Sequence, residues 1–320
     1  MRTKALAFAA TFVVVVCCDT DAATEQRPDL SRILMHSTVR IEVTKPNGQH
    51  TGTGFFYVIP HPSITSTVPL VVTCAHLLDG ATRGEFFFAI RGSNDQERIE
   101  TLRRVQFSDC GARWIHHPNP AVDLVALPMA PLMRELEKEG KGIDMAPFGP
   151  DLLPEQEKLD DLSLFQEVKV VGYPIGIWDT KNNLPIMRRG MVASDIGKDF
   201  NGGPQFLIDA AIMPGSSGSP VLVADDGTFL EGGGLRFGRR VIFLGVVHAT
   251  PMQPTPGKVE IIPLPTAFEA VSLTPVPSSL GVVLKARLLK DFAAVLGITE
   301  QAPANKVPED TARKLADPQH

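Results

Sequence analysis

The chain has 320 residues, of which 43% are hydrophobic and 21% charged, and a formal net charge of −5 at pH 7. This apolar content is enough for a sizeable core in one large or two smaller domains, which excludes an intrinsically disordered chain. The acidic balance and the scattered arginine pairs argue against a nucleic-acid-binding surface, so no nucleic acid is expected among the partners.

The first 23 residues have the layout of a secretory signal peptide. Basic residues precede an apolar run from Ala5 to Cys18, and small residues that suit cleavage follow near Ala22 or Ala23. The run is short for a membrane span, so no stable span is expected after processing and the predicted location is periplasmic or secreted. A lipid anchor on Cys17 or Cys18 is the competing interpretation, which the large Val16 before Cys17 disfavours.

An all-β fold is predicted after a polar N-terminal arm, residues 24–38. Short apolar stretches separated by proline and glycine turns indicate strands. The first domain is expected at residues 39–130, with strands at 39–43, 54–59, 70–73, 85–90, 105–107 and 124–127.

Residues 131–164 are richer in Glu, Lys and Pro and are predicted to link two domains. A terminal helix is expected from Arg287 to Leu296, where apolar residues recur at helical spacing before Gly297. The polar residues 298–320 are predicted to be a disordered tail. The second domain is expected at residues 165–297, with strands at 168–173, 191–193, 206–208, 221–223, 241–247 and 281–286.

Two cysteines, Cys74 and Cys110, lie beyond the leader. One disulfide at most is too few for a disulfide scaffold, so stability is expected to come from the core. The sequence leaves open whether the two are bridged or are small buried residues.

Three residues in separate stretches can form a nucleophilic site. Ser217 lies among small residues that let the backbone turn sharply between apolar flanks. His76 ends one apolar strand and Asp123 begins another, which supplies a base and a group to orient it. The sequence lacks His-x-x-x-His and Cys-x-x-Cys spacings, so neither a metal nor another cofactor is expected.

Four motifs, taken in order, resemble those of the chymotrypsin-like serine proteases, over roughly residues 39–296. They are Thr53-Gly54-Phe55-Phe56, Val72-Thr73-Cys74-Ala75-His76, Asp123-Leu124-Val125-Ala126-Leu127 and Gly215-Ser216-Ser217-Gly218-Ser219-Pro220. The resemblance implies two six-stranded antiparallel Greek-key β-barrels with a C-terminal helix. It also implies an endopeptidase that cleaves peptide or protein substrates through an acyl-enzyme.

The same resemblance implies a role for each site residue. Ser217 would be the nucleophile, His76 the general base and Asp123 the group that orients His76, while the N–H groups of Gly215 and Ser217 would form the oxyanion hole. The implied floor of the substrate pocket carries no charge, which predicts a small or apolar substrate residue before the scissile bond. The implied pocket residues are Ala211, Ile212, Val247, His248, Ala249, Thr250 and Gly281.

Two residues depart from the family pattern. Ser216 stands where zymogen-activated members carry an aspartate, so activation by an ion pair with a freed amino terminus is not expected. His248 stands where many members have a serine, and three interpretations stay open: contact with Asp123, recognition of an acidic substrate side chain, or a histidine at the edge of the core.

Two further stretches are expected near the site. Residues 226–240 are predicted to be an elongated hairpin tip, either a gate or a surface loop, and residues 172–190 are expected to pack around the pocket and support the oxyanion loop. A catalytically silent peptide-binding module is the alternative function, which the intact candidate triad disfavours. An α/β-hydrolase is disfavoured because Ser219 replaces the last glycine of Gly-x-Ser-x-Gly.

Overall fold

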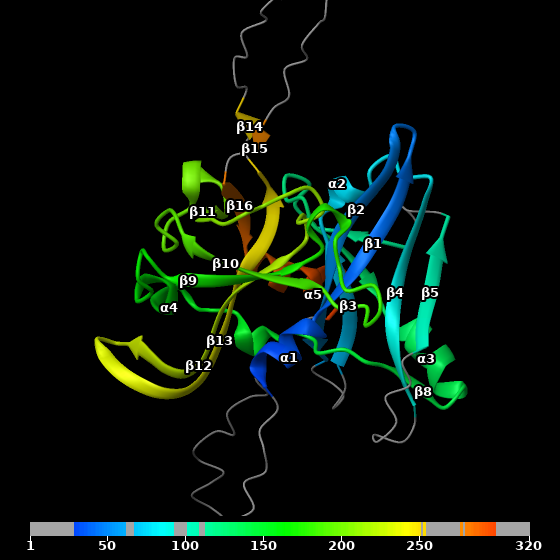
Figure 1. The fold of residues 1–320 in the computed structure, drawn as a ribbon, viewed down its shortest axis with the longest axis horizontal. Coiled ribbons are helices and arrows are strands. Elements are labelled where there is room, and N and C mark those ends of the chain that lie inside the picture. Colours follow the sequence, from blue (N-terminus) through cyan, green and yellow to red (C-terminus); the bar gives the residue numbers. More distant parts are fainter. Residues whose placement is uncertain are drawn as a thin grey trace, which may run out of the picture.

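The computed structural model describes residues 29–61, 67–92, 101–108, 113–250, 252–253, 276–277 and 279–298. The predicted signal peptide, Cys110 and all of the predicted tail except Ile298 lie outside these residues, so those interpretations stay predictions. The described part consists mainly of two antiparallel sheets that lie side by side (Figure 1).

The N-terminal sheet has eight strands in the order β5-β4-β1-β2-β3-β7-β6, with β8 paired to β4. Phe107 packs against Trp114 with ring centroids 5.9 Å apart, which brings the two ends of the sheet together although no pairing joins β5 to β6 among the described residues. The strands are β1 (Thr38–Lys45), β2 (Gly48–Pro60), β3 (Thr67–Thr73), β4 (Arg83–Gly92), β5 (Thr101–Phe107), β6 (Ile115–His116), β7 (Val125–Pro128) and β8 (Lys141–Ile143).

The C-terminal sheet is a closed barrel in the order β10-β11-β16-β13-β12-β9. Closure pairs each of these strands on both sides, so the barrel does not end in a free edge strand. The strands are β9 (Glu167–Gly172), β10 (Ile186–Val192), β11 (Gln205–Asp209), β12 (Pro220–Glu231), β13 (Gly234–Ala249) and β16 (Leu280–Lys285), and β14 (Met252–Gln253) pairs separately with β15 (Val276–Pro277).

The helices are short. The all-β prediction with a C-terminal helix is confirmed, while the N-terminal sheet has two strands more than expected. The α-helices are α1 (Leu30–Met35), α2 (Ala75–Leu78), α3 (Ala130–Lys138), α4 (Gln156–Asp160) and α5 (Asp291–Val295), and the 3-10 helices are η1 (Pro150–Leu152), η2 (Pro174–Gly176), η3 (Phe200–Gly202) and η4 (Ala286–Lys290).

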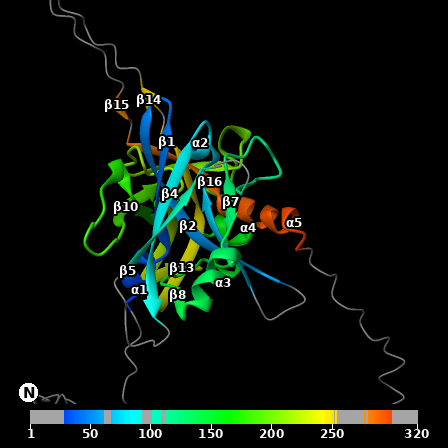
Figure 2. The same ribbon diagram turned by 90° about the vertical axis from the view of Figure 1, so that its right-hand side faces the viewer.

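One hydrophobic cluster joins the two sheets. It holds Phe55 of β2, Phe243 of β13 and Phe292 of α5, all fully buried, and the rings of Phe55 and Phe243 meet edge to face at 5.2 Å. The predicted N-terminal arm also contributes, because Leu30 and Leu34 of α1 are buried in the same cluster. Figure 2 shows α5 at the margin of the N-terminal sheet.

The hairpin of β12 and β13 extends away from the barrel at the lower left of Figure 1. Its turn begins about 13 residues before Val247, which at ~3.3 Å per residue places the tip tens of ångströms along the strand from the predicted pocket. The expectation that residues 226–240 lie near the site is therefore wrong, because the strands continue their pairing outward as far as Glu231 and Gly234. None of the helices in the described ranges is long and apolar enough to span a membrane.

Candidate active site

His76 lies in the first turn of α2, directly after β3. Its backbone N–H donates to Oδ1 of Asp123 at 2.7 Å, and its Nδ1 lies 2.5 Å from Oδ2 of the same carboxylate. Asp123 comes from the loop between β6 and β7, which runs beside the end of β3 because β3 pairs with β7. The sheet register thus brings together two residues that are 47 positions apart.

Ser217 lies in the loop between β11 and β12, and its Oγ is 3.2 Å from Nε2 of His76. An ionised carboxylate can only accept hydrogen bonds, so the proton on His76 is assigned to Nδ1 and the lone pair of Nε2 faces Ser217. The structure therefore brings the three predicted residues into one hydrogen-bonded chain from carboxylate to hydroxyl, in which Nε2 can accept the proton of Ser217.

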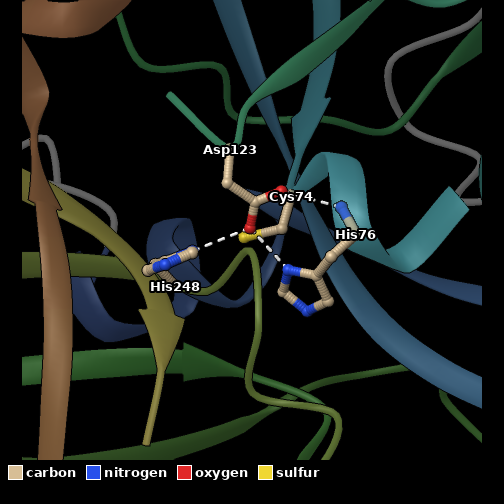
Figure 3. Close-up of side chains that lie close together, drawn as sticks. All are labelled: Cys74, His76, Asp123 and His248. Atoms are coloured by element: carbon tan, nitrogen blue, oxygen red, sulfur yellow. Dashed lines mark hydrogen bonds and ion pairs between the residues drawn. The ribbon is translucent and has the colours of Figure 1, made fainter. Parts of the chain in front are cut away.

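His248 of β13 approaches Asp123 from the side opposite His76. Its Nδ1 lies 2.7 Å from Oδ2 of Asp123, so this oxygen accepts from two imidazoles (Figure 3). The backbone carbonyl of His248 lies 3.5 Å from Oγ of Ser217. Of the three interpretations of His248, contact with Asp123 is thus observed, and the ring also lines the adjacent cavity.

The carboxylate of Asp123 is stabilised in its charged form. Burial raises its pKa, but hydrogen bonds from His248 and His76, with electrostatic attraction from His76, outweigh burial and hold the pKa far below the usual range. Asp123 is therefore ionised at every pH at which the protein would work, which is the state that an orienting acceptor needs.

Cys74 completes a group of four potential metal ligands with His76, Asp123 and His248, whose ligand atoms lie within 4.8 Å of one another. The sequence spacing gives no sign of this group. However, the contacts of Asp123 with the two imidazoles have hydrogen-bond lengths, and the buried Cys74 thiol donates to the carbonyl of Val247 at 3.4 Å. Burial and the charge of Asp123 raise the pKa of Cys74, which disfavours the thiolate that a metal requires.

The predicted oxyanion donors lie in the same loop as the Ser217 hydroxyl. Within the described ranges, the N–H groups of Gly215 and Ser217 have no hydrogen-bond acceptor, whereas the N–H groups of Ser216 and Gly218 are bonded to the carbonyls of Met213 and Val247. Two unpaired donors beside a candidate nucleophile can stabilise negative charge on a substrate oxygen.

A cavity of about 430 Å³ opens beside Ser217. Five of the seven predicted pocket residues line it, namely Ile212, Val247, His248, Ala249 and Thr250. Ala211 and Gly281 do not. The carbonyl of Ala211 accepts a hydrogen bond from Arg188, and Gly281 lies behind the pocket, where a Cβ would come within 2.7 Å of the Ile212 side chain.

Met213 and Pro214 also line the cavity and were not predicted from the sequence. Their place in the chain, between a predicted wall residue and a predicted oxyanion donor, was a signal that could have found them. Thr53 contacts the nucleophile loop from β2, and no local pattern indicates that contact. Ile175 lies within residues 172–190, which were expected to support the oxyanion loop, and its N–H donates to the carbonyl of Pro214.

Residues 52–230, more than half of the chain, match the family described as trypsin-like peptidase domain. No curated protein matches the sequence.

Several solved structures match the chain at low sequence identity. The Rv3671c protease from M. tuberculosis, in its active form, is 18% identical, with 93% of this chain and 97% of that chain covered and a TM-score of 0.41. A serine endoprotease from Yersinia pestis is 12% identical, with 83% and 64% covered and a TM-score of 0.43. A thermostable serine protease from an extremophilic microorganism is 11% identical, with 83% and 100% covered and a TM-score of 0.41.

Proposed function

We propose that this chain, which belongs to the trypsin-like peptidase family, is an exported serine endopeptidase with Ser217 as nucleophile. The observation that carries the proposal is the continuous chain of contacts from Asp123 through His76 to Ser217, at 2.5 Å and 3.2 Å. A carboxylate, an imidazole and a hydroxyl in this order are the arrangement that activates serine in acyl transfer.

In the proposed reaction, Oγ of Ser217 attacks the scissile carbonyl carbon while Nε2 of His76 takes the hydroxyl proton. The N–H groups of Gly215 and Ser217 stabilise the resulting oxyanion, and Asp123 stabilises the imidazolium. His76 then gives its proton to the leaving amine, which breaks the peptide bond and leaves an acyl-enzyme on Ser217. Water, activated by His76, hydrolyses that ester and restores the hydroxyl.

The cavity beside Ser217 indicates which residue precedes the scissile bond. Ile212, Met213, Val247 and Ala249 give it a mainly apolar lining, which supports a small or apolar side chain. His248 is the titratable cavity residue outside the proposed triad, so an acidic side chain is the second candidate. Cleavage of a peptide library separates the two, since recognition by His248 would favour Glu or Asp, whereas the apolar lining would favour small or apolar side chains.

The organisation of the whole chain is part of the proposal. Residues 1–23 would be removed on export, residues 24–38 form the arm, and domains at 39–130 and 165–297 flank a connection at 131–164, with a tail at 298–320. The leader sequence supports export, and mass spectrometry of the protein recovered from its native host distinguishes cleavage near Ala23 from acylation of Cys17 or Cys18.

Reaction with a fluorophosphonate probe tests the catalytic proposal. The wild-type protein is expected to form a covalent adduct, whereas Ser217→Ala is expected to form none because the attacking oxygen is missing. Ser163→Ala, which changes an exposed serine in the loop before β9, is the matched control and is expected to react like wild type. A folded wild type that binds peptides but does not react would instead support the silent peptide-binding module.

A further inference from the structure

Thr53 of β2 connects the N-terminal sheet to the nucleophile loop through its hydroxyl. Oγ1 donates to the carbonyl of Gly215 at 2.9 Å and accepts from the N–H of Tyr173 at 3.1 Å and from Oγ of Ser219 at 3.2 Å. A threonine hydroxyl has one donor and two acceptor positions, so its hydrogen-bonding capacity is fully used. The side chain is completely buried, and the partners are 120 to 166 residues away in sequence.

The backbone of Thr53 makes two further contacts at the same place. Its N–H donates to the carbonyl of Ser217 at 2.9 Å, and its carbonyl accepts from the hydroxyl of Thr73 at 2.7 Å. The loop also lies close against this strand, because a Cβ on Gly218 would be only 1.9 Å from the Thr53 carbonyl oxygen. Thr53 therefore contacts the loop on both sides of Ser217.

The direction of each oxyanion donor depends on the carbonyl of the same peptide unit. In a planar trans peptide the N–H points opposite to the C=O, so holding one holds the other. The N–H of Gly215 belongs to the unit with the Pro214 carbonyl, which accepts from the N–H of Ile175 at 2.5 Å. The N–H of Ser217 belongs to the unit with the Ser216 carbonyl, which accepts from the N–H of Ser219 at 2.9 Å.

Ile175 supplies its N–H from an unfavourable backbone conformation. Its φ is +52°, in the left-handed region that β-branched residues avoid, although its side chain is exposed. Such a conformation is unfavourable and persists only where its surroundings hold it. The Thr53 hydroxyl is one of those restraints, because it binds the N–H of Tyr173 at the start of the same turn.

Ser216 shows that no ion pair holds this loop from within. Its buried hydroxyl accepts the N–H of Met213 at 3.2 Å, and its own N–H donates back to the Met213 carbonyl at 3.0 Å. Residues 213–219 of the loop are thus held by neutral hydrogen bonds, each of modest strength, which makes a single residue with three of them important.

We propose that Thr53 is a positioning residue that holds Gly215 and Ser217 with their N–H groups turned toward the substrate oxyanion. Its hydroxyl acts through neighbouring groups. It binds the Gly215 carbonyl, in the peptide unit that follows the Gly215 N–H, and it binds the N–H of Tyr173, which begins the turn whose Ile175 N–H holds the Pro214 carbonyl. The inference rests on the proposed function, because it concerns the oxyanion hole of the same reaction.

The test compares Thr53→Val, which keeps the shape but removes the hydroxyl, with Thr53→Ser, which keeps the hydroxyl. Loss of one oxyanion donor lowers kcat by about 10²–10³-fold, so partial misplacement in Thr53→Val is expected to lower kcat about 10–100-fold. KM is expected to stay within about threefold, because ground-state contacts are unchanged. Affinity for a peptide aldehyde, whose adduct carries an oxyanion, is expected to fall in parallel with kcat, and Thr53→Ser is expected to retain most of both.

Circular dichroism and urea unfolding show which variants are folded. If Thr53→Val does not fold, Thr53→Cys is used in its place. Its thiol is a weaker donor than the hydroxyl, so its kcat is expected to be intermediate. Equal kcat values in folded Thr53→Val and Thr53→Ser overturn the inference, whether these values match that of the wild type or fall below it. A wild-type protein that never reacts with fluorophosphonate overturns the proposed function instead.

Discussion

Asp123 accepts three hydrogen bonds from two histidines, which distinguishes it from an acid that holds one imidazole. Oδ1 takes the backbone N–H of His76, while Oδ2 takes Nδ1 of His76 and Nδ1 of His248. Since two donors share Oδ2, the carboxylate is fixed in position as well as in charge. The sequence raised this contact as one of three interpretations of His248, and the structure contains it.

Replacing Asp123 with Asn tests whether the carboxylate orients His76. The amide would offer an N–H group toward Nδ1, which disfavours the tautomer whose Nε2 can accept the Ser217 proton. We expect kcat to fall about 10³–10⁴-fold, with the fold unchanged by circular dichroism. An Asp123→Asn variant with wild-type kcat in peptide hydrolysis would refute this role.

Asp144 provides a matched control, because it also pairs with a histidine but lies outside the site. Hydrogen bonds from His36 and then Arg91 lower its pKa against the effect of burial. The ionised Asp144 carboxylate and its partners stabilise the fold at pH values above about 3.9, the pKa of Asp in the unfolded chain. This contribution is lost as the pH falls through the lower pKa of Asp144 in the folded protein.

The variant Asp144→Asn is expected to keep wild-type kcat and to lose about 1 kcal/mol of unfolding free energy at pH 7, a figure reduced for solvent screening of this partly exposed group. Its stability is also expected to fall less than that of wild type between pH 7 and pH 3. Urea unfolding at both pH values measures the difference, and an unchanged acid slope would contradict the assignment.

At the scale of elements, the nucleophile loop requires a glycine at position 218 for two separate reasons. Gly218 has φ +86° and also lies against the Thr53 carbonyl, where a Cβ would be 1.9 Å from the oxygen. Gly233, in the turn between β12 and β13, has φ +73°, and a Cβ added there would meet no atom of the described residues within 4 Å. Both positions require a backbone with positive φ, but only at Gly218 does another part of the chain lie close enough to exclude a Cβ.

We therefore expect Gly218→Ala and Gly233→Ala to behave differently. Gly233→Ala adds only the left-handed penalty of about 1–2 kcal/mol and should leave the fluorophosphonate reaction unchanged. Gly218→Ala adds a backbone clash, so the loop must move and covalent labelling should fall below detection. Similar labelling rates in the two folded variants would show that close packing at Gly218 is dispensable.

At the scale of the whole molecule, the two sheets depend on one another. The cluster that contains Phe55, Phe243 and Phe292 crosses from one sheet to the other, and the candidate site lies where loops from both sheets meet. Phe292 also packs edge to face on His117 of the N-terminal half at 5.5 Å. The C-terminal helix thus stabilises both halves.

Truncation of Phe292 tests this coupling. A fully buried phenylalanine replaced by alanine typically costs about 3–5 kcal/mol, so the urea midpoint of Phe292→Ala should fall strongly. Unfolding should remain a single transition, whether followed by tryptophan fluorescence or by circular dichroism. Val295→Ala, on the exposed side of the same helix, is the control and should change stability little. Two separated transitions in wild type would contradict a shared core.

Much of this architecture was predictable from short-range patterns. Alternating apolar residues and turn residues predicted the strands, and Gly297 marked the end of the terminal helix, where its φ is +70°. The two additional strands, β6 and β8, were not predicted. They have two and three residues, too few for a periodic pattern, and they are defined only by their pairing with β7 and β4. The outward course of residues 226–240 was missed for a similar reason, since a hairpin can be recognised locally but its direction depends on the sheet to which it belongs.

The sequence by itself determined the chemical groups and their order: an imidazole, a carboxylate and a hydroxyl beside small residues, within an all-β chain. The tertiary structure alone decided that His248 shares Oδ2 of Asp123, that Ala211 and Gly281 lie outside the cavity, and that Thr53 binds the nucleophile loop. The reason is physical. Residue type and local spacing decide which contacts a segment can make, whereas contacts between groups more than 100 residues apart depend on sheet register and on how two sheets pack.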